Sequence, residues 1–213
     1  MLLRVLQSGS LWFVLSLLPL LRAVLLLWQG ELVNPVEFIT RSSGTWALVF
    51  LLLTLAITPL RQISGWSGWL QYRRMLGLYA FFYAVLHFGI YLWLDQLFDW
   101  AAIVRDIIER PFITVGMLAL LLLIPLAMTS TKAMMRRLKR RWGQLHRLIY
   151  PIAILAVVHF WWLVKKDLSE PMIYAAVLTL LLGWRCRAWL LGFTGRLKQQ
   201  NARAHNPHRG QAG

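Results

Sequence analysis

Six long apolar runs take up most of this 213-residue chain and leave only short connections between them. Each run approaches the length that an α-helix needs to cross the hydrocarbon core of a bilayer, about 20 residues. A helix also satisfies its own backbone hydrogen bonds, as a spanning segment must in lipid. The sequence therefore predicts an all-α membrane protein, a six-helix transmembrane bundle with spans at 11–28, 45–60, 75–94, 112–128, 145–163 and 172–191.

The sequence predicts a single domain boundary. We expect one membrane domain over residues 1–192 and a basic, disordered cytoplasmic tail over residues 193–213, which is polar and rich in helix-breaking residues. The first run is followed by no small-residue cleavage site, so we interpret it as a retained helix rather than a signal peptide. Cys186 is the single cysteine, so redox chemistry would require a bound cofactor rather than a disulfide.

Acidic and basic residues lie in alternate connections between the predicted spans, and so on opposite sides of the membrane. A net charge of +15 would suggest a nucleic-acid partner in a soluble protein, but all eight acidic residues lie in the connections after spans one, three and five. The other connections carry Arg61, Arg73, Arg74 and six basic residues between 132 and 141. Because basic loops stay in the cytoplasm, we expect both termini to be cytoplasmic, and the basic clusters to contact membrane lipid and no nucleic acid.

Three histidines, His87, His146 and His159, lie in or at the mouth of apolar runs. A histidine in hydrocarbon is costly unless it is paired or ligated. Two neutral imidazoles can ligate heme iron and leave no unpaired charge in the lipid. His87 and His159 lie roughly 18 Å and 21 Å from the cytoplasmic ends of their spans, so they share a level in the outer half of the membrane. We predict that these two are the axial ligands of one heme b.

His146 lies at the cytoplasmic mouth of its span, roughly 20 Å from the level of the other two histidines. A second heme there would need another histidine about 13 residues before His87, where Arg73 and Arg74 stand instead. Arginine is not an ordinary heme ligand, but it binds phosphate well. This end is therefore suited to a phosphate-bearing cofactor. For His146, two interpretations are equally favoured: capping of a helix end or contact with lipid headgroups, and a role in a second heme or flavin site.

The helical neighbours of the outer histidines suit a cleft for a flat ring, although alanine is equally expected wherever helices pack closely in lipid. The positions three, four and seven residues before His87 are Ala84, Tyr83 and Ala80. The same positions before His159 are Ala156, Leu155 and Ile152.

Three arginines are candidate partners for heme propionates. Arg22 lies near the middle of the first span, where snorkelling toward an interface is the alternative explanation. Arg105 and Arg110 precede the fourth span, where an ordinary surface charge near Asp106 and Glu109 is the alternative.

Four segments resemble the MsrQ family, once called YedZ: ITPLR (57–61), RRMLGLYAFFYAVLHF (73–88), RPFITVG (110–116) and TSTKAMMRRLKRRWGQLHRLIYPIAILAVVHFWWLVK (129–165). That family comprises heme-binding membrane subunits of the bacterial periplasmic methionine-sulfoxide reductase system, and it is related to the transmembrane domain of ferric reductases and NADPH oxidases. His87, His146 and His159 fall on its three characteristic histidines. Arg22 and the SSG segment at 42–44, where the family usually has TG, depart from its pattern.

The resemblance implies an electron-transferring cytochrome b of the bacterial inner membrane without substrate catalysis of its own. It would take electrons from the quinone pool or a cytosolic flavin reductase. It would pass them through heme b to the periplasmic molybdopterin-containing subunit MsrP, which reduces methionine sulfoxide in oxidised envelope proteins. The resemblance also implies FMN, for which Arg73, Arg74 and His146 are the first candidates because their charge suits a phosphate.

Two other classes of function stay open at this point. A metal or proton-coupled transporter would use the same histidines, but such carriers commonly use intramembrane carboxylates, and no Asp or Glu lies inside any predicted span. A structural anchor for a periplasmic enzyme would predict that replacing His87 costs no activity. A self-contained ferric reductase is disfavoured because the chain lacks a flavin and nucleotide domain.

Overall fold

The computed structural model describes residues 9–30, 32–164 and 168–205, with side chains as far as Arg187 in the last helix. The long helices are α2 (Gly9–Gln29), α3 (Pro35–Ser64), α4 (Leu70–Ile90), α6 (Pro111–Met128), α9 (Ile149–Leu163) and α10 (Ser169–His205). Short segments connect them: η1 (Ser67–Trp69), η2 (Tyr91–Asp95), α5 (Trp100–Glu109), α7 (Lys132–Leu138), α8 (Arg140–Leu145) and η3 (His146–Leu148). No strand occurs in these described ranges, and the predicted all-α class is confirmed.

Five helical segments of the described chain are long and apolar enough to cross a membrane: Ser10–Gln29, Pro35–Ser64, Ser67–Asp95, Pro111–Met128 and Arg140–Leu163. Large apolar side chains such as Phe13, Leu21 and Leu121 are about half exposed, as expected for a surface that faces lipid. The protein is a multi-pass membrane protein. The sixth predicted span, which falls within α10, is not among the five, so the six-span count and the cytoplasmic termini stay predictions.

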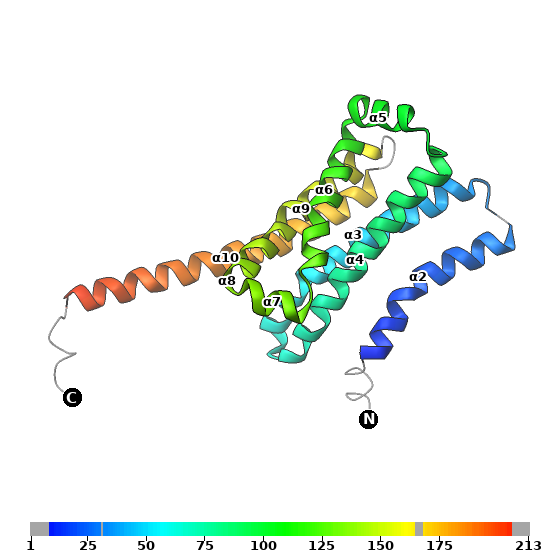
Figure 1. Ribbon diagram of the computed structural model, residues 1–213. Helices are drawn as coiled ribbons and strands as arrows, with labels where there is room; N and C mark the ends of the chain where they lie inside the picture. Colours follow the sequence, from blue (N-terminus) through cyan, green and yellow to red (C-terminus); the bar gives the residue numbers. More distant parts are fainter. Residues whose placement is uncertain (1–8, 31, 165–167, 206–213) are drawn as a thin grey trace.

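The helices form two packed pairs, α3 with α4 and α6 with α9, and all four meet around one core (Figure 1). The amphipathic α5 lies across one end of this bundle, and α7 and α8 lie at the other. We call these the α5 end and the α7 end. The described acidic residues gather at the α5 end, whereas Arg61, Arg73 and the basic residues of α7 and α8 gather at the α7 end. The sorting of charge seen in the sequence is thus a sorting between the two ends of the bundle.

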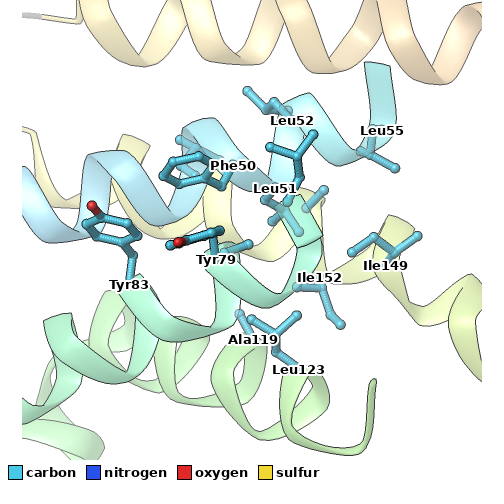
Figure 2. Close-up of a cluster of buried hydrophobic side chains, with 14 of the residues drawn as sticks. Phe50, Leu51, Leu52, Leu55, Tyr79, Tyr83, Ala119, Leu123, Ile149 and Ile152 are labelled. Atoms are coloured by element: carbon cyan, nitrogen blue, oxygen red, sulfur yellow. The ribbon is translucent and has the colours of Figure 1, made fainter. Parts of the chain in front are cut away.

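The core combines aromatic rings of α3 and α4, among them Phe50, Tyr79 and Tyr83, with aliphatic side chains of α3, α6 and α9 (Figure 2). The Phe50 ring stacks on Tyr79 and Tyr83 at centroid distances of 5.5 and 5.3 Å. The two tyrosine hydroxyls donate hydrogen bonds to backbone oxygens of α2, Tyr79 to Phe13 at 3.0 Å and Tyr83 to Ser16 at 2.9 Å. Buried hydroxyls need such acceptors, so these bonds hold α2 against α4.

Helix α3 begins well before the span predicted at 45–60. The Asn34 side chain accepts a hydrogen bond from the Glu37 backbone N–H at 3.2 Å and donates one to the Glu37 carboxylate at 3.0 Å, and Pro35 takes the first helical position. Hydropathy detects the apolar part of a helix and misses its polar first turns. As a result, Thr40 and Gly44 lie on a helix and line the interior of the bundle rather than a connection.

Helix α10 continues to His205, past the predicted boundary at residue 192. Residues 193–205, expected as the start of a disordered tail, are helical, and residues 206–213 lie outside the described chain. The stretch holds Arg, Leu, Lys, Gln and Ala, which are good helix formers, and its first proline comes only at Pro207. The division into a membrane domain and a basic tail stays a prediction.

Candidate cofactor site

A cavity of about 310 Å³ lies between α3, α4, α6 and α9 and reaches toward the α5 end. Its walls are mainly apolar and include Leu48, Leu51, Leu123 and Ile152. Its polar lining comes from residues near the α5 end of these helices: Thr40, Arg41, Tyr91, Asp95 and Arg110. An apolar chamber of this size with a few convergent polar groups is typical of a cofactor site.

His87 on α4 and His159 on α9 face each other across this cavity. Their ring centroids are 6.2 Å apart and the ring planes are inclined by 74°. The structure therefore brings together the two histidines that the sequence places at one level. Most of each imidazole is buried, since both residues are only partly accessible and line the chamber.

Each histidine is held through one ring nitrogen by a backbone carbonyl. His87 Nδ1 lies 2.8 Å from the Thr40 oxygen, and His159 Nδ1 lies 2.6 Å from the Phe112 oxygen. A carbonyl can only accept, so each Nδ1 carries the proton and donates, and each Nε2 keeps its lone pair. Metal-binding histidines commonly have this arrangement, because the second hydrogen bond fixes the tautomer and orients the ring.

The separation of the rings fits one metal ion held between them. A metal–nitrogen bond is about 2 Å long and a ring centroid lies about 1 Å beyond its nitrogen, so two such ligands place their centroids about 6 Å apart. Within the described residues, no group of three or more His, Cys, Asp or Glu side chains could hold a metal ion. A macrocycle could supply the remaining ligands of a metal held by these two histidines, as it does for heme iron. The residues present fit a bis-histidine heme.

The neighbours predicted to form a cleft are only partly on the cavity wall. Ala80, Ala84, Ile152 and Ala156 line it. Tyr83, by contrast, packs on Phe50 and bonds to α2, and Leu155 is not among the lining residues. The three alanines and Ile152 thus face the space where a flat ring would lie, whereas Tyr83 supports the packing of α4 against α3 and α2.

Of the arginines proposed as propionate partners, only Arg110 lines the cavity. Its Nε lies 3.1 Å from an Asp106 carboxylate oxygen, and its side chain is 55% exposed. Arg22 and Arg105 are exposed and are not part of the lining. Arg41, which is not among the arginines singled out from the sequence, also lines the cavity and pairs with Glu170 at 3.1 Å. It lies in the polar part of α3 that was expected to be a connection.

The structure places His146 outside this cavity, at the α7 end. Its Nε2 lies 3.0 Å from the Thr129 hydroxyl, and its ring stacks on Trp142 with the centroids 4.0 Å apart. Trp142 in turn donates a hydrogen bond to the Thr129 carbonyl at 3.0 Å. These contacts tie the end of α6 to the start of the segment that leads into α9. These contacts favour the helix-end alternative for His146, and its role stays a prediction.

The candidate phosphate-binding arginines at the α7 end differ in their exposure to solvent. Arg74 is exposed and Arg73 is half-buried. Sequence analysis did not single out Arg185 of α10, whose guanidinium donates to Thr58 Oγ1 at 2.8 Å and to the Leu55 carbonyl at 3.2 Å, and lies over the Tyr150 ring. The nearby basic groups on α4 and in the α7–α8 segment make this end strongly positive.

The comparisons with known proteins agree with this geometry. The family described as "Ferric reductase like transmembrane component" matches residues 43–157, which include His87 and end two residues before His159. No solved structure matches the chain significantly.

Curated relatives extend the match over most of the chain. A protein of Xanthomonas campestris pv. campestris (strain 8004) is 61% identical over 152 residues, which cover 71% of this chain and 70% of the relative. A protein of Bordetella pertussis is 53% identical over 185 residues, which cover 84% of this chain and 88% of the relative. Each is named "Protein-methionine-sulfoxide reductase heme-binding subunit MsrQ". This chain therefore belongs to the MsrQ family, within the ferric reductase-like transmembrane proteins.

Proposed function

We propose that this protein is the heme-binding, electron-transferring membrane subunit of a bacterial methionine-sulfoxide reductase system, with His87 and His159 as the axial ligands of one heme b. The observation that carries the proposal is the pair of imidazoles 6.2 Å apart across a largely apolar cavity, each with Nδ1 held by a carbonyl and Nε2 left for a metal. The names of the relatives at 53% to 61% identity support it.

The residues of the site have distinct tasks in this function. The Thr40 and Phe112 carbonyls fix the tautomer and the direction of each ring, so that neither ligand must reorganise when the charge of the site changes. The apolar walls keep water from the metal, and Arg41 and Arg110 supply positive charge where propionates would reach the α5 end. A heme bound here supplies a one-electron carrier buried in the membrane domain.

The electron donor and acceptor follow from the family. We propose that electrons come from the quinone pool or from a cytosolic flavin reductase and leave to the periplasmic molybdopterin-containing subunit MsrP, which repairs oxidised periplasmic proteins. The protein would lie in the inner membrane with the α5 end outward and both termini cytoplasmic. The gathering of acidic residues at the α5 end and of basic residues at the α7 end supports that orientation.

We also propose that the α7 end holds FMN through its phosphate, at Arg73, Arg74 and His146. The support is electrostatic, because basic residues accumulate there and the acidic side chains of the described chain lie at the other end. Replacing both Arg73 and Arg74 by alanine should lower the flavin content of the purified protein and leave heme unchanged. An unchanged flavin content would end this part of the proposal.

The test of the heme assignment is the reduced-minus-oxidised absorption spectrum of the purified protein beside His87→Ala, His159→Ala and His146→Ala, with heme and flavin quantified in each. We expect the b-type signal to be lost in the first two variants and kept in the third, because only His87 and His159 line the cavity. Partial loss in all three would mean two hemes or a shared ligand. Absence of heme from the parent protein would leave a transporter or a structural anchor as the function.

A further inference from the structure

The surroundings of the two cavity histidines are the same on both sides. In each case the Nδ1 contact joins residues 47 apart in the sequence, His87 to Thr40 and His159 to Phe112. In each case a glycine stands four residues after the carbonyl residue, Gly44 after Thr40 and Gly116 after Phe112. Every residue of the second set thus follows its counterpart by 72 positions, so the α3–α4 pair and the α6–α9 pair carry one unit twice.

Both glycines lie directly against the imidazole of their unit. A Cβ added at Gly116 would lie 2.7 Å from His159 Nδ1 and 2.8 Å from its Cε1. A Cβ added at Gly44 would lie 3.0 Å from His87 Nδ1 and 3.1 Å from its Cε1. The contacts at Gly116 are too close for carbon, so a larger residue there would move the ring of His159. The contacts at Gly44 are tight, so the ring of His87 would have to give by a few tenths of an ångström. The first unit has slightly more room than the second.

The position of the glycine also explains how a carbonyl that is bonded within its own helix can accept from an imidazole. Within an α-helix, the oxygen of residue i accepts from the N–H of residue i+4, and the side chain of residue i+4 lies over the turn that contains that oxygen. Here residue i+4 is the glycine. Without a side chain it leaves the Thr40 or Phe112 oxygen accessible to an imidazole from the neighbouring helix. The Thr40 oxygen also accepts a hydrogen bond from the Ser43 hydroxyl at 3.0 Å.

We propose that Gly44 and Gly116 are positioning residues for the two ligand histidines: each clears the space in which an imidazole lies flat against α3 or α6 and exposes the carbonyl that holds its Nδ1–H. The inference rests on the proposed function for the identity of the ligand metal. It adds that ligand direction is set by a duplicated carbonyl–glycine unit, one copy on each side of the cavity.

The test compares Gly44→Ala and Gly116→Ala with two glycines of α4 as matched controls. A Cβ at Gly77 would meet only Thr54 side-chain atoms at 3.7 Å or more, and a Cβ at Gly89 would meet nothing within 4 Å. We expect Gly116→Ala to weaken heme retention on the order of tenfold, the scale at which altered outer-shell partners weaken metal sites, and Gly44→Ala to weaken it less. Gly77→Ala and Gly89→Ala should retain heme like the parent protein.

Two further readouts separate positioning from damage to the fold. Alanine is a better helix former than glycine, so the heme-free forms of Gly44→Ala and Gly116→Ala should unfold no earlier than the heme-free parent. The heme that remains should show a changed electron paramagnetic resonance spectrum and a shifted reduction potential, because both depend on ligand orientation. In a His159→Ala background, where the colliding ring is gone, Gly116→Ala should leave the thermal unfolding of the heme-free protein unchanged or raise its midpoint.

The outcomes are distinguishable. If the two histidine variants lose heme while Gly44→Ala and Gly116→Ala match the controls in heme content, spectrum and potential, the positioning role is wrong and the heme assignment stands. If the histidine variants keep heme, the proposed function itself fails. Earlier thermal unfolding of heme-free Gly116→Ala, both with and without His159, would show that the substitution acts on the fold and would also overturn the inference.

Discussion

At the scale of single residues, side chains and backbone make different contributions to the site. The two imidazoles supply the lone pairs, and two backbone carbonyls supply their orientation. The charged members of the cavity, Arg41 and Arg110, lie near its polar end and are each paired with a carboxylate. These arginines can tune a bound heme without being needed as ligands.

We predict that Arg41→Ala and Arg110→Ala each lower the reduction potential of the heme, because losing a positive charge nearby favours the ferric state. Each side chain is about half exposed and already paired, at 52% and 55% exposure, so solvent screens the effect. We expect a shift on the order of 30 mV, well below the 59 mV or so that one tenfold change requires. Potentiometric titration measures it, with the exposed Arg105→Ala as control. A rise in potential in either cavity variant would contradict this role.

At the scale of elements, the start of α3 decides whether the first carbonyl–glycine unit exists. The cap made by Asn34 and Glu37 allows the helix to begin at Pro35 and thereby to include Thr40 and Gly44. On the other side, Pro111 begins α6 directly after Arg110, one residue before Phe112. Both units therefore lie near a helix N-terminus, and the precision of the site depends on how firmly those ends are formed.

Replacing Asn34 by alanine should destabilise the protein by about 1 kcal/mol, the usual worth of an N-cap, and should increase heme loss from detergent solution. The matched control is Asn34→Ser, whose hydroxyl can still accept from the backbone N–H of Glu37 and adds no charge beside the Glu37 carboxylate. Thermal unfolding and heme content measured side by side test the prediction. Equal melting temperatures for Asn34→Ala and Asn34→Ser would show that the cap does not stabilise α3.

At the scale of the whole molecule, the two ends of the bundle carry different functional groups. The histidine pair and the described acidic residues lie toward the α5 end, and the basic residues of α4 and of α7 and α8 lie toward the α7 end. The positive-inside rule then predicts an orientation with the cavity outward, on the side where we propose that a periplasmic partner docks.

The orientation can be tested by labelling in a Cys186→Ser background, which removes the free cysteine. A membrane-impermeant maleimide should react with Glu109→Cys, at the end of α5, in cells whose outer membrane alone has been permeabilised. It should react with Lys132→Cys, at the start of α7, only after lysis. The reversed pattern would contradict the outward placement of the cavity.

The sequence by itself determined the class of protein, most of the spans and the pairing of His87 with His159, because hydrophobic length, charge asymmetry and depth along a helix are local properties. It could not show where α3 begins, since polar helical turns carry no hydropathy signal. It also could not show that Gly44 touches one histidine and Gly116 the other. The 72-residue repeat of carbonyl, glycine and histidine involves three isolated positions in each copy, and only tertiary packing, which brings helices far apart in the chain into contact, makes those positions one unit.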